Sequence, residues 1–74
     1  MDYLTRVRQI AADTFGIPLE TISPQSSSDN IEAWDSLGHL NFILALEREL
    51  GVRFTNLAEV LSIKAIVSRI TNED

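Results

Sequence analysis

Apolar residues recur every three or four positions in three separate segments of this 74-residue chain. In an α-helix this spacing places the residues on one face, so each segment is predicted to form an amphipathic helix. The first helix is expected over residues 2–15, and the last begins after Ser62. Asp2 and Ser62 are suitable N-caps, and Gly16 is a suitable C-terminal stop. The apolar positions of these two helices are Leu4, Val7, Ile10, Ala11 and Phe15, and Ile63, Ile66, Val67 and Ile70.

The middle helix is expected to run from Ser36 to Leu50, with Gly51 as its stop. It is apolar nearly all round, which is unusual in so short a chain. One side consists of Phe42, Ile43, Leu46 and Leu50, and a second stripe, centred roughly 140° away, consists of Leu37, Leu40 and Leu44. We assign the first side to the core and expect the leucine stripe to be at least partly exposed, as a binding site for a partner protein or as the edge of a ligand-binding site. Alternatively, loop residues such as Trp34 cover the stripe.

A long connection over residues 17–35 separates the first two helices, because Pro18 and Pro24 interrupt any regular period. The three serines at 26–28 are predicted to be solvated loop. Some of the spaced apolar residues in this connection are expected to enter the core: Leu19, Ile22, Ile31 and Trp34. A short helical turn capped by Thr55 or Asn56 precedes the last helix.

These elements predict an all-α fold, a small four-helix bundle of three main helices and one short helix, with a long loop between the first and second helices. We expect residues 1–74 to form a single domain, because 45% apolar content suffices for one small core. The chain has no cysteine, which excludes disulfides and thiolate metal sites. It contains no apolar run that could span a membrane and no secretory signal pattern, so we expect a monomeric cytoplasmic protein.

The net charge is −5, which argues against nucleic-acid binding, because that function requires a basic patch. Ser36, His39 and Asp35 stand within one helical turn and could suggest a nucleophile, base and orienter. We reject a hydrolase because residues so close on one turn rarely orient one another, and nothing supplies an oxyanion hole. His39 is expected to be a surface histidine, and no metal-ligand spacing is present. We therefore expect no catalytic activity.

Ser36 remains the outstanding candidate, as a hydroxyl at a helix start with an acid before it and an apolar stripe after it. One interpretation is an ordinary helix cap. Another is a modification site, because a phosphodiester on Ser36 would lie near the positive end of a helix dipole.

The motifs around Ser36 resemble those of the acyl carrier protein and peptidyl carrier family. The resemblance is carried, in order, by Ile22-Ser23-Pro24, Trp34-Asp35-Ser36-Leu37, Leu44-Ala45-Leu46-Glu47 and Gly51-Val52-Arg53-Phe54. It implies that Ser36 carries a 4′-phosphopantetheine arm derived from coenzyme A, and that Asp35 helps a phosphopantetheinyl transferase to recognise the site. It also implies a partner-docking face on the second helix, formed by Leu37, Leu40, Leu44 and Glu47. Cargo would travel on the arm as a thioester, and the carrier itself would catalyse nothing.

The chain departs from carriers of fatty acid synthesis in one respect. Those members usually carry acidic residues soon after the serine, whereas Gly38 and Asn41 stand here and Arg48 interrupts the later acids. In having Trp34 before the Asp-Ser-Leu triplet, the motif resembles that of the dedicated carriers of specialised pathways. We therefore predict a carrier of acyl or aminoacyl groups in polyketide, nonribosomal peptide, lipid or cell-envelope biosynthesis, served by an activating ligase, synthase or transferase. The alternatives are a housekeeping fatty acid carrier and an unmodified helical interaction module.

Overall fold

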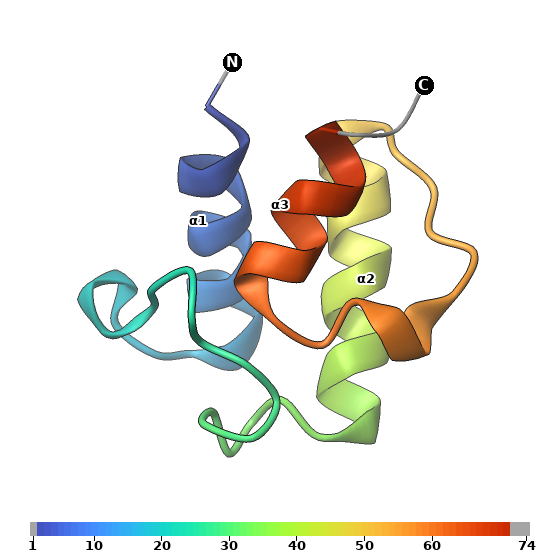
Figure 1. Cartoon of the computed structure of the whole chain (residues 1–74). Coiled ribbons are helices and arrows are strands. Elements are labelled where there is room, and N and C mark those ends of the chain that lie inside the picture. Colours follow the sequence, from blue (N-terminus) through green and yellow to red (C-terminus); the bar gives the residue numbers. More distant parts are fainter. Residues whose placement is uncertain (1, 72–74) are drawn as a thin grey trace.

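Three α-helices form a bundle in the computed structural model, which describes residues 2–71 (Figure 1). Helix α1 packs against both α2 and α3. Two 3₁₀ turns, η1 and η2, lie in the connections before α2 and α3 respectively. The elements in chain order are α1 (Tyr3–Phe15), η1 (Leu19–Thr21), α2 (Ser36–Leu50), η2 (Leu57–Glu59) and α3 (Ile63–Thr71).

The all-α prediction is confirmed, and the short fourth element is a single 3₁₀ turn. Its N-cap, Asn56, makes no side-chain capping hydrogen bond, and Val60 directly after the turn is buried in the core. The turn spans only the three residues Leu57–Glu59. Within residues 2–71 the only β-type pairing is an isolated bridge between Ser27 and Ser62, and no described helix is long and apolar enough to cross a membrane.

The helix ends follow the capping signals in the sequence. Asp2 caps α1 by accepting hydrogen bonds from the Thr5 N–H (3.3 Å) and the Thr5 hydroxyl (2.6 Å). Ser62 caps α3 by accepting from the N–H three residues later, at 3.0 Å. Gly16 and Gly51 end α1 and α2 with φ of 67° and 68°, a conformation that glycine adopts without steric cost.

The core lies where the three helices meet the long loop. Phe15, Trp34 and Phe42 form an aromatic cluster with ring centroids 5.1–5.3 Å apart. The predicted core side of α2 is confirmed, with Leu50 only half-buried at its end. The buried apolar residues are Val7, Ile10, Ala11, Phe15, Ile22, Ile31, Trp34, Phe42, Ile43, Ala45, Leu46, Phe54, Val60, Ile63, Ile66 and Ile70.

The loop between α1 and α2 is anchored by apolar side chains and by one arginine. Ile22, Ile31 and Trp34 enter the core as expected, while Leu19 is half-buried. The Arg8 guanidinium of α1 donates to the carbonyl oxygens of Ile22 (2.8 Å) and Leu19 (3.1 Å). These bonds satisfy loop carbonyls and fix the path of the chain toward α2.

The prediction that serines 26–28 are merely solvated loop is wrong. Ser26 is buried, and its carbonyl oxygen accepts from the Ile63 N–H at 2.9 Å. The Ser28 N–H donates to the Leu61 carbonyl at 3.0 Å. The first N–H groups of a helix have no partner within the helix. This loop supplies acceptors for two of them in α3, because the Lys64 N–H also donates to the Pro24 carbonyl at 3.0 Å. Composition alone does not reveal such a long-range pairing.

Candidate functional site

Ser36 is the first residue of α2, and its exposed side chain follows the capping residue Asp35. Asp35 Oδ1 accepts from the Gly38 N–H at 2.8 Å, and the Asp35 carbonyl accepts from the His39 N–H at 2.7 Å. The cap is therefore Asp35, and the Ser36 hydroxyl makes no hydrogen bond within residues 2–71. The structure removes the interpretation of Ser36 as a simple helix cap and leaves its hydroxyl available.

Gly38 allows the loop to pass close to the first turn of α2. A Cβ atom built on Gly38 would lie 2.0 Å from the Ala33 carbonyl oxygen, far inside van der Waals contact. Any side chain at this position requires the backbone around Ala33 to move. The acidic residue that the fatty acid carriers bear near this point of the sequence is therefore incompatible with the present path of the loop.

A hollow of about 320 Å³ lies beside Ser36 at the N-terminal end of α2. It is lined by residues from the long loop, from α2 and from the segment after η2, namely Ser28, Trp34, Asp35, Ser36, His39 and Leu61. The backbone N–H groups of Ser36 and Leu37 have no acceptor among residues 2–71, and they lie at the positive end of the helix dipole. An exposed hydroxyl with free amides beside it fits a serine-linked phosphodiester.

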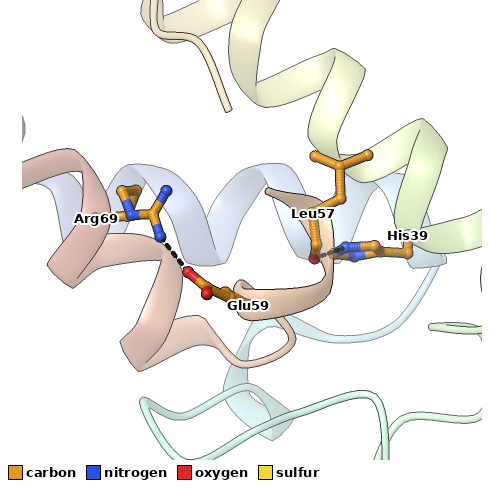
Figure 2. A network of polar contacts seen from close by, with 4 residues as sticks. All are labelled: His39, Leu57, Glu59 and Arg69. Atoms are coloured by element: carbon orange, nitrogen blue, oxygen red, sulfur yellow. Dashed lines mark hydrogen bonds and ion pairs between the residues drawn. The ribbon is translucent and has the colours of Figure 1, made fainter. Parts of the chain in front are cut away.

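His39 is bonded at both ring nitrogens, so the expectation of a plain surface histidine is wrong. Its Nδ1 accepts from the Trp34 indole N–H at 2.8 Å, and its Nε2 lies 2.9 Å from the Leu57 carbonyl oxygen (Figure 2). The two rings also stack, with centroids 6.1 Å apart and planes 28° apart. Because neither nitrogen is available to Ser36, the rejected Ser–His pairing has no base in this structure.

The predicted leucine stripe on α2 is exposed: Leu37 has 66%, Leu40 45% and Leu44 51% of its surface accessible. Trp34 does not cover it, because Trp34 is buried against Phe15 and Phe42. We call the three leucines of this stripe, Leu37, Leu40 and Leu44, the leucine patch. A further leucine, Leu61, is 40% exposed in the connection before α3. Leu61 was missed from the sequence because it stands in a connection, where no helical period marks it.

The exposed positions of α2 from Ser36 to Leu44 are all uncharged. Glu47, the predicted acidic member of the docking face, is half-buried, and its Oε2 accepts from the Phe54 N–H at 2.9 Å. This bond ties the segment after α2 back onto the helix. Among residues 2–71 no group of three or more acidic or histidine side chains is arranged to hold a metal ion.

The chain matches the family of phosphopantetheine attachment sites over residues 5–70. It therefore belongs to this family, the acyl carrier proteins, whose members bear a 4′-phosphopantetheine arm and act as carriers rather than enzymes. It is similar to acyl carrier protein AcpXL from Mesorhizobium japonicum, with 35% identity over 48 residues. The aligned region covers 65% of this chain and 52% of that protein, so the chain spans about half the length of this curated relative.

Proposed function

We propose that the chain carries acyl groups as thioesters on a 4′-phosphopantetheine arm attached to Ser36. The observation that carries this proposal is the Ser36 side chain, exposed at the first position of α2 and unbonded because Asp35 takes over the capping. The arm, once attached, supplies a terminal thiol for the cargo. The name of the relative supports acyl groups as the cargo, whereas aminoacyl groups are the second possibility.

Attachment requires a transferase that brings its own base. The reaction forms a P–O bond at Ser36 Oγ, breaks the pyrophosphate bond of coenzyme A, and releases adenosine 3′,5′-bisphosphate and the serine proton. Both His39 ring nitrogens are bonded elsewhere, so His39 does not take this proton. Asp35 fixes the first turn of α2 through the Gly38 N–H and presents an exposed carboxyl beside Ser36, which we assign to recognition by the transferase.

Enzymes that load or use the cargo are expected to dock on the leucine patch. Leu37, Leu40 and Leu44 lie along the exposed face that begins at Ser36, and this face bears no charged residue before Glu47. Apolar contacts with ligases, synthases or transferases should therefore dominate docking over contacts between charged groups. Glu47 contributes to this face with its remaining carboxylate oxygen.

The pathway is proposed to be a specialised one rather than housekeeping fatty acid synthesis. The support is the lack of charge on this face between Ser36 and Leu44, together with the tight approach of Ala33 to Gly38, which leaves no room for an acidic side chain there. The test is reconstitution of a fatty acid synthase with this chain as its sole carrier. Negligible product is expected, and full replacement of the housekeeping carrier would contradict the specialised role.

The attachment site is tested by incubating the protein with coenzyme A, Mg²⁺ and a broad-specificity phosphopantetheinyl transferase, followed by intact-protein mass spectrometry. The chain should gain the mass of one phosphopantetheine. Ser28→Ala is the matched control, because Ser28 lines the same hollow as Ser36. Ser28→Ala should still be loaded and Ser36→Ala should not. Failure of the folded native chain to gain mass with several transferases would favour an unmodified interaction module.

A further inference from the structure

Ser28 and Leu61 come from distant segments of the chain, and both line the hollow beside Ser36. The Ser28 N–H donates to the Leu61 carbonyl at 3.0 Å, and the adjacent residues Ser27 and Ser62 form an isolated antiparallel bridge. This backbone pairing holds Ser28 of the long loop next to Leu61 of the connection before α3. The fold therefore places a serine and a leucine together within reach of the residue at the start of α2.

Leu61 keeps an apolar side chain in solvent although the residues on either side of it are fixed. Val60 is buried in the core, and Ser62 caps α3 by accepting from the Ala65 N–H at 3.0 Å. The backbone of Leu61 is thus held at both ends, whereas 40% of its surface is accessible. A group that is already held in place loses little conformational freedom when a ligand covers it. Leu61 is therefore suited to contact an apolar group of a ligand.

Ser28 adds an unused polar group next to this leucine. Its side chain is half-buried, and its hydroxyl makes no hydrogen bond within residues 2–71. A serine hydroxyl can donate one hydrogen bond and accept others. By contrast, the side-chain nitrogens of His39 and Trp34 are bonded to each other and to the Leu57 carbonyl. The Ser28 hydroxyl is thus free to bond a ligand that lies against Leu61.

The charge of the lining favours an uncharged ligand. No lysine or arginine lines the hollow, and its acidic residue is Asp35, whose Oδ1 accepts from the Gly38 N–H. A carboxylate with no cation beside it repels a phosphate group, so the hollow itself is unsuited to free phosphate or a nucleotide. The free N–H groups at the start of α2 remain the place for a phosphodiester. A neutral chain that contains both apolar and amide groups fits the hollow.

We propose that the hollow is a resting site for the pantetheine portion of the arm, in which Leu61 contacts the dimethyl group and the Ser28 hydroxyl bonds the polar groups that follow. In phosphopantetheine the phosphate is followed by a methylene, a carbon with two methyl groups, a hydroxyl and then the first amide. The apolar group is therefore nearest to the serine, and the polar groups come next. The hollow, at about 320 Å³, lies at the lower end of the range of about 300–1,000 Å³ for ligand pockets. This inference rests on the proposed attachment of the arm to Ser36.

The resting site leaves the proposed docking face accessible. None of the three leucines of the leucine patch lines the hollow. An arm that rests against Leu61 therefore lies toward the connection before α3 and not along the exposed face of α2. An enzyme that binds the leucine patch does not compete with the resting arm, and the arm can leave the hollow after the enzyme has docked.

NMR of the loaded chain tests the resting site without any measure of activity. The chain is labelled with carbon-13 and nitrogen-15 and loaded with unlabelled coenzyme A, and intact mass confirms the arm. Isotope-filtered nuclear Overhauser spectra should show contacts from the two methyl groups of the arm to the Leu61 methyl groups. The Ser28 amide resonance should shift between the unloaded and the loaded chain. Contacts of the arm with Leu37 or Leu40 in place of Leu61, or no contact with any residue of the hollow, would overturn the proposal.

Leu61→Ala and Leu44→Ala form a matched pair, because the two leucines are 40% and 51% exposed and only Leu61 lines the hollow. In loaded Leu61→Ala the methyl resonances of the arm should move to their positions in free coenzyme A, whereas loaded Leu44→Ala should keep the native positions. Equal effects of the two changes would overturn the Leu61 contact. In loaded Ser28→Ala the first amide of the arm should exchange its hydrogen faster than in the native chain, and an unchanged rate would overturn the Ser28 contact.

The same samples separate the resting site from the attachment site. A chain that gains the mass of one phosphopantetheine but shows no contact between the arm and the hollow would refute the resting site and leave the attachment to Ser36 standing. A folded chain that gains no mass with several transferases would refute the attachment and the resting site together.

Discussion

Replacing Asp35 with alanine removes the acceptor that caps α2. The Gly38 N–H loses its 2.8 Å bond to Asp35 Oδ1, and loss of such a cap costs about 0.5–2 kcal/mol. In a domain of 60–100 residues each kcal/mol lowers the melting temperature by about 4–8 °C. Thermal unfolding followed by circular dichroism should therefore show Asp35→Ala melting roughly 4–8 °C below the native chain, for a cap of about 1 kcal/mol.

Asp35→Asn separates the capping role from the recognition role. Asparagine keeps an oxygen at the position of Oδ1 and caps helices about as well as aspartate, so its melting temperature should stay close to that of the native chain. It lacks the negative charge that we assign to transferase recognition, so both variants should be loaded more slowly at Ser36. Equal destabilisation in Asp35→Asn and Asp35→Ala would refute the capping argument. Native loading of a folded Asp35→Asn would refute recognition through charge.

Three further predictions concern other parts of the chain. Gly38→Ala should lower the melting temperature, because the added Cβ would meet the Ala33 carbonyl at 2.0 Å. A glycine-to-alanine change inside a helix normally stabilises by about 1 kcal/mol, so a higher melting temperature would contradict the close approach. Leu44→Ser should alter the unfolding free energy by no more than about 0.5 kcal/mol, since Leu44 is 51% exposed. The same change should weaken binding to a cargo-loading enzyme, measured by calorimetry. Unchanged binding would show that Leu44 is not part of the docking face. The Thr5 hydroxyl donates to Asp2 and thereby lowers the pKa of the Asp2 carboxyl below its ordinary 3.8. The ionised Asp2 therefore stabilises α1 fully above pH 3.8, and this stabilisation is lost as the pH falls through the lowered pKa. In Thr5→Val, NMR titration of Asp2 should give a pKa closer to 3.8, and an unchanged pKa would contradict this cause.

The helices could be predicted because their signals are local. Asp2 and Gly16 bracket α1 within one segment of sequence, and Gly51 ends α2 through a backbone conformation that glycine favours. The exposed leucine stripe could also be predicted from the sequence, because α2 has more apolar residues than one buried face can use.

The roles of residues in the connections could not be predicted, because they depend on contacts between distant segments. Ser26 is buried because its carbonyl serves the first turn of α3, 37 residues further along the chain at Ile63. His39 resembles a surface residue in the sequence, and only the fold brings the Leu57 carbonyl to its Nε2. The sequence likewise could not show that Asp35, and not Ser36, caps α2, because this depends on the geometry at the start of the helix.

The position of the phosphodiester on the native chain tests the central claim most directly. The chain has seven serines, so fragmentation mass spectrometry of the loaded, unmutated protein discriminates among them. The phosphopantetheine should be found on Ser36 alone, because its exposed hydroxyl is the one that stands at the start of α2 without a hydrogen bond. Its presence on another serine, or a folded chain that no transferase loads, would contradict the proposal that Ser36 carries the arm.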